Sequence, residues 1–193
     1  MAAFVLGNGV SRQDISLHEL KKHGTIYGCN ALYRDFIPTV LVATDMAISQ
    51  EIQKTGYARE HRFYTRRPMP TMGALEVPKR YFGFSSGPIA ISLAVQDIND
   101  PIYLLGFDMG PTQSGKFNNV YAGTEFYKPT EAGPTFTGNW LKQLVRVMQD
   151  AANNNFVRVC GDTTVRYPEL DQLPNLRHCS IDEFVLQVNT PKD

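Results

Sequence analysis

Ala2-Ala3-Phe4-Val5-Leu6-Gly7-Asn8-Gly9-Val10-Ser11 opens the chain with an apolar run that ends in a glycine turn. A short apolar run bounded by glycine is typical of a buried strand. Residues 16–22 follow, with Leu17 and Leu20 spaced to lie on one face of a short helix. This sequence of strand, turn and helix predicts the first unit of an α/β fold.

The same alternation continues along the chain. Apolar runs rich in β-branched residues predict strands, and apolar residues spaced three and four apart predict helices. We expect further strands at 25–29, 39–44, 62–65, 102–106 and 156–160, and further helices at 46–55, 86–98, 137–152 and 181–186. Strands that are apolar on both faces and separated by helices predict a mostly parallel sheet with helices on both faces, a three-layer arrangement.

We expect a single α/β domain over residues 1–193, because no internal repeat, low-complexity tract or linker interrupts this pattern. A long loop at about 109–135, rich in glycine and proline, separates the strand at 102–106 from the next helix. Loops of this length inside a compact domain are usually functional. We therefore expect the loop to act as a lid that closes over a site.

The composition excludes several classes of protein. Lysine plus arginine and aspartate plus glutamate are equal at 19 each, so no net charge attracts the chain to nucleic acid. The cysteines Cys29, Cys160 and Cys179 are few and odd in number, which predicts free thiols in a reducing compartment. No apolar run approaches the ~18 residues that a membrane span needs, and the first residues lack a basic stretch typical of a signal peptide. We expect a cytoplasmic protein.

Five polar or glycine-rich segments follow strands or open a helix, at 7–11, 29–31, 44–46, 85–87 and 106–109. In an open parallel sheet, ligands bind at the carboxyl ends of the strands, near the point where the strand order reverses. We therefore expect these segments to gather at one edge of the sheet and to form a ligand site there.

The first of these segments is a glycine turn that allows two readings. Gly7 and Gly9 let a backbone approach a phosphate or a ribose closely, but a plain tight turn needs the same residues. The dinucleotide fingerprint has a third glycine where this chain has Arg12, and no Gly-Lys-Ser/Thr motif is present. A standard nicotinamide or flavin site and a P-loop are therefore not expected.

The polar residues of the other segments also have two interpretations each. Asn30 is a turn residue or a ligand contact. Ser85 and Ser86 are helix caps, or they form an anion site together with the free backbone N–H groups at the helix start. Asp45 and Asp108 cap helices or hold a divalent cation beside a phosphate.

Residues 57–80 are locally basic, and two histidines are candidate acid–base groups. The segment contains six lysines and arginines but only two glutamates, which indicates either a solvated surface or contact with an anionic substrate. His61 and His178 are the candidate acid–base groups, and no pair of histidines has the spacing of metal ligands on one helix face. The cations of the segment are Arg59, Arg62, Arg66, Arg67, Lys79 and Arg80.

Four stretches together form an ordered set: 4–11, 27–33, 86–94 and 102–108. This set resembles the bacterial lipooligosaccharide sialyltransferases and the wider group of motility accessory factors and hydroxymethylpterin diphosphokinase-like proteins. The shared features are a Gly-Asn-Gly turn, an asparagine after the second strand, a Ser-Gly helix start and a Gly-X-Asp strand end. The resemblance covers a little over a third of the chain.

The resemblance implies a Rossmann-like sheet of the glycosyltransferase A-variant type that holds a nucleotide, which in the sialyltransferases is the CMP of CMP-sialic acid. It implies catalytic roles for Asp108, with Tyr121 and Arg80 as the nearest matches to a tyrosine and an arginine of the family. The nucleotide-binding residues that we assign on this basis are Gly7, Asn8, Gly9, Ser11, Asn30, Asp45, Ser85, Ser86, Gly87, Gly106 and Phe107.

The chain departs from the family in its lid. The sialyltransferases place a histidine general base after the Gly-X-Asp strand end, whereas residues 109–150 contain no histidine. Gly110 stands where the family has a tyrosine, and Val10 stands where the family prefers a proline. Loss of a general base alone costs ~10²–10⁴ in rate.

Three functions remain open. The first is a sialyltransferase-like glycosyltransferase that binds a CMP-like nucleotide sugar and an unknown acceptor, and that requires no cofactor or metal. The second is pyrophosphate transfer with magnesium held by Asp45 or Asp108. The third is a non-catalytic nucleotide-binding protein. We expect no nucleic-acid partner, and the resemblance implies that the chain forms homo-oligomers.

Overall fold

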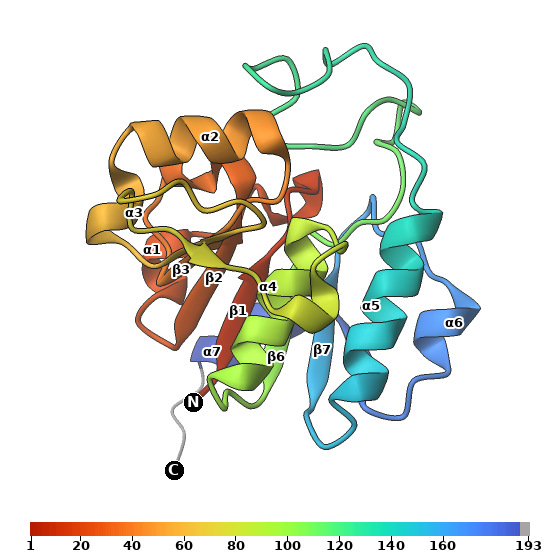
Figure 1. Cartoon of the computed structure of the whole chain (residues 1–193). Coiled ribbons are helices and arrows are strands. Elements are labelled where there is room, and N and C mark those ends of the chain that lie inside the picture. The colour runs from red at the N-terminus through yellow and green to blue at the C-terminus, as the bar shows by residue number, and fades with distance from the viewer. Residues whose placement is uncertain (190–193) are drawn as a thin grey trace.

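The computed structural model describes residues 1–189 and contains one sheet of eight strands, all of them parallel (Figure 1). The strand order is β5-β4-β3-β2-β1-β6-β7-β8. Residues 190–193 of the expected domain lie outside the described part. The strands are β1 (Ala3–Leu6), β2 (Thr25–Cys29), β3 (Val40–Val42), β4 (Phe63–Thr65), β5 (Leu75–Glu76), β6 (Ile102–Leu105), β7 (Phe156–Cys160) and β8 (Leu176–Ser180).

The opening strand β1 lies in the middle of the sheet, between β2 and β6. From β1 the chain builds outward through β2, β3, β4 and β5, and then returns to place β6 on the other side of β1. The strand order therefore reverses between β1 and β6, which is the position where sheets of this kind bind ligands.

Both faces of the sheet are covered, as the apolar pattern predicts. Ala3 and Val5 of β1 pack into one hydrophobic cluster, and Phe4 and Leu6 pack into a second cluster on the opposite face. The helices α4 (Ser86–Gln96), α5 (Gly138–Asp150) and α6 (Pro168–Asp171) contribute to the first cluster. The other face is covered by α1 (Leu17–Leu20), α2 (Met46–Lys54), α3 (Tyr57–Glu60) and α7 (Ile181–Asn189) (Figure 1). The predicted three-layer, Rossmann-like α/β fold is confirmed.

Helix α4 is the most buried helix of the described chain. Its own side chains are apolar on almost every side, so nearly all of its surface is covered by other elements. It packs against β1, β2 and β3 on one side and against α5 on another. The burial of α4 fixes the position of its first residues at the carboxyl edge of the sheet. Within residues 1–189, no helix has both the length and the apolar character that a membrane crossing requires.

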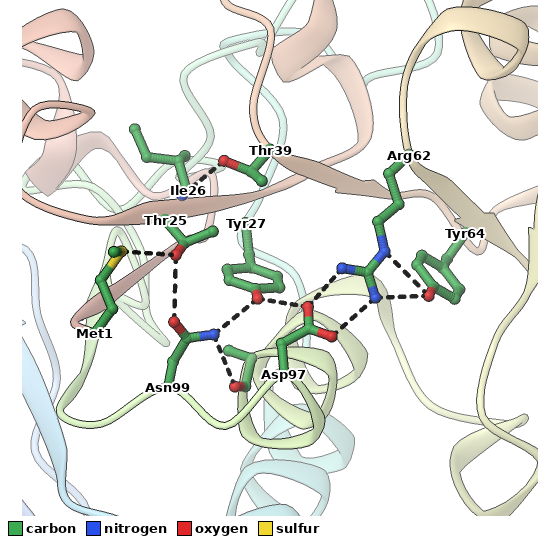
Figure 2. Close-up of polar contacts among 10 residues, drawn as sticks. Met1, Thr25, Ile26, Tyr27, Thr39, Arg62, Tyr64, Asp97 and Asn99 are labelled. Atoms are coloured by element: carbon green, nitrogen blue, oxygen red, sulfur yellow. Dashed lines mark hydrogen bonds and ion pairs between the residues drawn. The ribbon is translucent and has the colours of Figure 1, made fainter.

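A polar network joins β2, β4 and the end of α4 at the amino edge of the sheet (Figure 2). Tyr27 donates its hydroxyl proton to Asp97 over 2.7 Å and accepts a hydrogen bond from Asn99 over 2.9 Å. Arg62 donates to both carboxylate oxygens of Asp97, over 2.6 and 2.9 Å, and also to the hydroxyl of Tyr64. The polar atoms of this edge therefore satisfy one another.

Candidate functional site

A cavity of about 240 Å³ lies at the carboxyl ends of β1, β2, β3 and β6, beside the reversal of the strand order. It brings together residues from all five segments that the sequence singled out. The predicted site residues that line it are Gly7, Asn8, Gly9, Asn30, Asp45, Ser85, Ser86, Gly87, Gly106, Phe107 and Asp108.

The glycine turn after β1 lies directly against the end of β6. The backbone N–H of Gly9 donates to the carbonyl oxygen of Gly106 over 2.9 Å. A β-carbon on Gly7 would come within 2.6 Å of that oxygen, and one on Gly9 would come within 2.5 Å of the Asp108 carboxyl carbon. Since side chains have no room at either position, the turn requires glycine for packing, and this packing shapes the floor of the cavity.

Arg12 stands where a dinucleotide fingerprint has its third glycine, and its side chain has a structural role there. Its side chain is buried and folds back into the turn, where Nε donates to the carbonyl oxygen of Gly7 over 2.7 Å. Its Nη2 donates to Oδ1 of Asn8 over 3.2 Å. The arginine therefore braces the turn from behind, in a role that the sequence motif did not reveal.

The start of α4 supplies backbone donors to the cavity. Ser85 is the N-cap residue, and its side chain makes no capping hydrogen bond. In the described chain, the backbone N–H groups of Ser86 and Gly87 have no hydrogen-bond partner, although both residues line the cavity. Free N–H groups and the positive end of the helix dipole favour an anion at this point.

The hydroxyl of Ser86 is used within the protein and is not free for a ligand. It donates to Oδ1 of Asn30 over 3.0 Å and accepts the backbone N–H of Thr44 over 3.0 Å. Asn30 has a left-handed backbone, with φ of 53°, which brings its side chain back toward α4. Its Nδ2 group has no partner within residues 1–189, so the amide is held by Ser86 with a donor left for a ligand.

The carboxylate of Asp108 joins three loops. It accepts hydrogen bonds from the backbone N–H and hydroxyl of Ser11, from Nδ2 of Asn118 and from the hydroxyls of Thr163 and Thr164. Both oxygens are thereby occupied by protein donors. Ser11 itself lies outside the cavity lining and bonds to Asp108, and its contact with a nucleotide stays a prediction. Asp108 thus ties these loops together beside the cavity, and its catalytic role stays a prediction.

Among known proteins, a solved structure shares the fold of this chain. No protein-family model and no curated protein matches the sequence. A solved structure of a MAf glycosyltransferase from Magnetospirillum magneticum AMB-1 superposes with a TM-score of 0.52 over 92% of this chain, at 16% identity. The two proteins share a fold. The match covers 33% of the other chain, so this chain spans about a third of that protein's length.

This likeness supports the resemblance to the motility accessory factor group at the level of the fold. It does not extend to the sialyltransferase or diphosphokinase features of the resemblance. Those features depend on individual residues of the site.

Tyr121 and Arg80, which were expected to act in catalysis, lie outside the cavity lining. Arg80 forms an ion pair with Asp150, with Nη2 and Oδ1 2.6 Å apart. Tyr121 is buried in the second hydrophobic cluster beside Tyr127, with the ring centroids 5.7 Å apart, and burial raises the pKa of Tyr121. Both side chains serve packing and ion pairing, and we assign neither of them a role in the cavity.

The long loop forms one wall of the cavity. The N–H of Val120 donates to the carbonyl oxygen of Asn8 over 2.8 Å, and the N–H of Val10 donates to Oδ1 of Asn118 over 2.9 Å. Farther along, the Tyr127 hydroxyl accepts the N–H of Ala31. These bonds hold the loop against the first turn and against the 3-10 helix η2 (Asn30–Arg34). The loop residues that line the cavity are Met109, Gly110, Phe117, Asn118, Asn119 and Thr135.

Aromatic and aliphatic side chains form the far wall. Trp140 and Leu144 of α5 line the cavity together with Phe107 and Phe117. Such a wall is suited to the face of a nucleobase or another flat apolar group. The sequence predicted α5 as a helix but gave no signal that its first turns reach the site.

Few titratable groups line the cavity. Burial raises the pKa of Cys29 to about 12, which keeps the thiol neutral. Asp45 is exposed at the start of α2, and its carboxylate makes no capping bond and has no partner in the described chain. Asp45 is therefore the one lining carboxylate whose oxygens are free, because those of Asp108 are occupied. Among residues 1–189, no three His, Cys, Asp or Glu side chains cluster as metal ligands.

The two candidate histidines lie outside the cavity lining. His61 packs against Tyr57, with ring centroids 4.6 Å apart. His178 places Nδ1 3.6 Å from Sγ of Cys160 and Nε2 3.0 Å from a carboxylate oxygen of Asp171. Burial lowers the pKa of His178 and raises that of Cys160, which favours a neutral imidazole and a thiol rather than an activated pair.

Proposed function

We propose that this chain is a glycosyltransferase of the sialyltransferase-like type, which binds a CMP-like nucleotide sugar in the cavity and transfers the sugar to an acceptor. The observation that carries the proposal is the start of α4, where the N–H groups of Ser86 and Gly87 open unpaired onto the cavity. Backbone donors at a helix start are a natural site for the phosphate of a nucleotide.

The rest of the cavity suits the nucleoside. The aromatic wall of Phe107, Phe117 and Trp140 offers apolar contact to a base, and the free Nδ2 of Asn30 offers one directional donor. A volume of about 240 Å³ is small for a ligand site, since such sites usually measure ~300–1,000 Å³. The size favours a mononucleotide over a dinucleotide.

Asp45 is the proposed general base, in place of the missing lid histidine. Its carboxylate takes the proton of an acceptor hydroxyl while that oxygen forms a bond to the anomeric carbon of the sugar. The bond from the same carbon to the phosphate oxygen breaks, and the nucleotide leaves with the electron pair. The N–H groups of Ser86 and Gly87 then stabilise the negative charge on the departing phosphate. The scheme uses no metal ion.

One observation favours a second candidate, a nucleotide-binding protein without catalysis. No histidine lines the cavity, and the oxygens of Asp108 are occupied by protein donors. Asp45 alone therefore decides between the two candidates. Slow hydrolysis of the donor in the absence of acceptor identifies an enzyme, and binding with no hydrolysis identifies a binding protein.

A thermal-shift panel tests the proposal. The ligands are CMP, CMP-sialic acid, UDP-sugars, GDP-sugars, ATP and GTP, each with and without magnesium. A ligand at 100 times its dissociation constant adds about 2.7 kcal/mol to the stability of the folded state. We expect CMP and CMP-sialic acid to stabilise the protein without magnesium. Stabilisation only by ATP with magnesium favours diphosphate transfer, and no response to any nucleotide contradicts the proposal.

A further inference from the structure

A second cavity, of about 470 Å³, adjoins the first one. The two share Thr44 and Asp45, so Asp45 lies at the border between them. The rest of the lining comes from the first turns of α2, from the segment that follows β4, including Arg66 and Arg67, and from Phe82. It therefore opens at the same edge of the sheet as the nucleotide cavity.

The charged residues of this lining are Asp45, Arg66 and Arg67. Within the described chain, neither arginine forms an ion pair with a carboxylate. Arg66 donates Nη2 to the carbonyl oxygen of Phe84 over 2.7 Å, and Arg67 has only a contact from Nη1 to the sulfur of Met46 at 3.6 Å. The cavity thus holds two guanidinium groups that lack an anionic partner.

One of these groups has an unsatisfied donor. Nε of Arg66 is buried and has no hydrogen-bond partner in the described residues. Buried donors are almost always paired in folded proteins, because an unpaired one costs free energy. The Arg66 guanidinium is therefore incompletely paired within the described chain.

We propose that the second cavity is an anion-binding subsite for a carboxylate or phosphate group of a reacting substrate. The planar guanidinium matches both anions, since it offers two parallel N–H donors to two oxygens. Asp45 carries the one negative charge of the lining against the two guanidinium charges, so the lining is net positive and attracts an anion. The inference rests on the proposed function only in giving this anion to a substrate.

This placement orients the second substrate. An acceptor whose anionic group is held by Arg66 and Arg67 presents a hydroxyl toward Asp45, which is the proposed base. Alternatively, the anionic group belongs to the transferred sugar, which would then extend from the phosphate at α4 into the second cavity. The two sources share one chemistry, and titrations with CMP, CMP-sialic acid and phosphate separate them.

The first experiment is a titration with inorganic phosphate, in the wild type and in Arg67→Gln. Arg59→Gln is a matched control, because Nη2 of Arg59 also contacts a methionine sulfur, that of Met72 at 3.6 Å, but Arg59 does not line the cavity. Loss of a charge-assisted hydrogen bond predicts about tenfold weaker phosphate binding in Arg67→Gln. Phosphate at the start of α4 affects both variants equally, so the difference between them isolates the second cavity.

Equal phosphate affinity in the Arg67→Gln and Arg59→Gln variants overturns the subsite. Arg66→Gln adds a second comparison, with the unfolding transition measured alongside because Arg66 also holds the Phe84 carbonyl. Arg67 is exposed and forms no hydrogen bond to oxygen or nitrogen through its side chain within residues 1–189, so Arg67→Gln tests the subsite in a folded protein.

CMP affinity, measured in parallel, separates this inference from the proposed function. If CMP fails to bind the wild type while Arg67→Gln still loses phosphate, the subsite stands and the nucleotide proposal falls. If CMP binds all variants and phosphate affinity is the same in each, the nucleotide proposal stands and the subsite falls. Weaker binding of CMP-sialic acid but not of CMP by Arg67→Gln assigns the anion to the sugar. Phosphate that still binds in the presence of saturating CMP-sialic acid, with an affinity that Arg67→Gln weakens, assigns the anion to the acceptor.

Discussion

The polar groups at the two edges of the sheet differ in whether they have hydrogen-bond partners within the protein. At the amino edge, the polar side chains form hydrogen bonds with one another (Figure 2): Asp97 accepts from Tyr27 and Arg62, and Asn99 donates to Tyr27. At the carboxyl edge, the N–H groups of α4, the Nδ2 of Asn30 and the carboxylate of Asp45 face cavities without a partner.

This difference indicates which edge carries function. Polar groups inside a folded protein are usually satisfied, and the exceptions concentrate at sites that bind something. At the amino edge, the polar side chains join β2, β4 and α4 to one another. The carboxyl edge keeps donors on one side of Asp45 and cations on the other. Substitutions at the amino edge are therefore expected to change stability, and those at the carboxyl edge to change binding and turnover.

The largest expected effect is on turnover, at the carboxyl edge. Replacing Asp45 with asparagine removes the proposed base, so we expect donor hydrolysis and sugar transfer to fall by ~10²–10⁴. The unfolding midpoint is expected to stay unchanged, because the Asp45 carboxylate has no partner in the described chain. Rates with CMP-sialic acid, compared with an Asp14→Asn control on the surface, measure this. An undiminished rate in Asp45→Asn would show that Asp45 is not the base.

The next largest effect is on stability, at the amino edge. Asp97→Ala leaves Arg62 and the buried Tyr27 hydroxyl without their acceptor. We expect the free energy of unfolding to fall by about 2 kcal/mol, a value below that of a fully buried pair because both charged side chains are partly exposed. Urea denaturation measures it. Glu19→Gln, which breaks the exposed pair with Lys22, should leave the free energy of unfolding nearly unchanged.

The comparison between edges requires that Asp97→Ala leave nucleotide affinity unchanged once the variant is folded. A loss of CMP binding that matches the loss of stability would mean that the two edges are coupled, and the division between them would fail.

A smaller effect is expected on affinity when Asn30 is replaced with glycine. Glycine accepts the left-handed backbone of this position, so the fold is kept while the amide is removed. We expect CMP to bind about tenfold more weakly, which corresponds to loss of one hydrogen bond of about 1.4 kcal/mol. Ile98→Gly is the matched control, because Ile98 also has a positive φ, of 59°, but is exposed at the amino edge. Equal CMP affinity in both variants would remove Asn30 from the site.

The smallest effect is a pH dependence of stability from Asp97. Burial alone would raise the pKa of Asp97, but hydrogen bonds from Arg62 and Tyr27 outweigh it and lower the pKa below 3.8. As the pH falls, the unfolded chain is therefore protonated first. The stabilisation is complete above pH 3.8 and is lost as the pH falls through the folded pKa. Urea denaturation between pH 5 and 2 should show a steeper loss in the wild type than in Asp97→Ala, and parallel curves would contradict this.

The centre of the fold was predictable from sequence because the apolar pattern is local. Strands at 25–29 and 156–160 match β2 and β7 to the residue, and the expected helix at 86–98 matches α4 within two residues at its end. The edge strands β5 and β8 were missed. Leu75 and Glu76 are both exposed, and β8 mixes Arg177 and His178 with apolar residues. Edge strands form by pairing with a neighbour, so their own sequence carries less signal.

The site was predictable where it depends on backbone geometry. Glycine turns and a Ser-Gly helix start mark the carboxyl ends of strands, and those segments do meet in one cavity. The partners of side chains were not predictable, because they come from distant parts of the chain. Arg80 pairs with Asp150, and Trp140 reaches the cavity from α5. No spacing in the sequence records either contact.

Amide chemical shifts during a CMP titration test most directly whether a nucleotide binds at the start of α4. We predict saturable shifts of the backbone amides of Ser86, Gly87 and Asn30, without magnesium, while the amides of Asp97 and Asn99 at the opposite edge stay in place. Unchanged amides at Ser86 and Gly87 at millimolar CMP, or shifts confined to another surface, would contradict the claim.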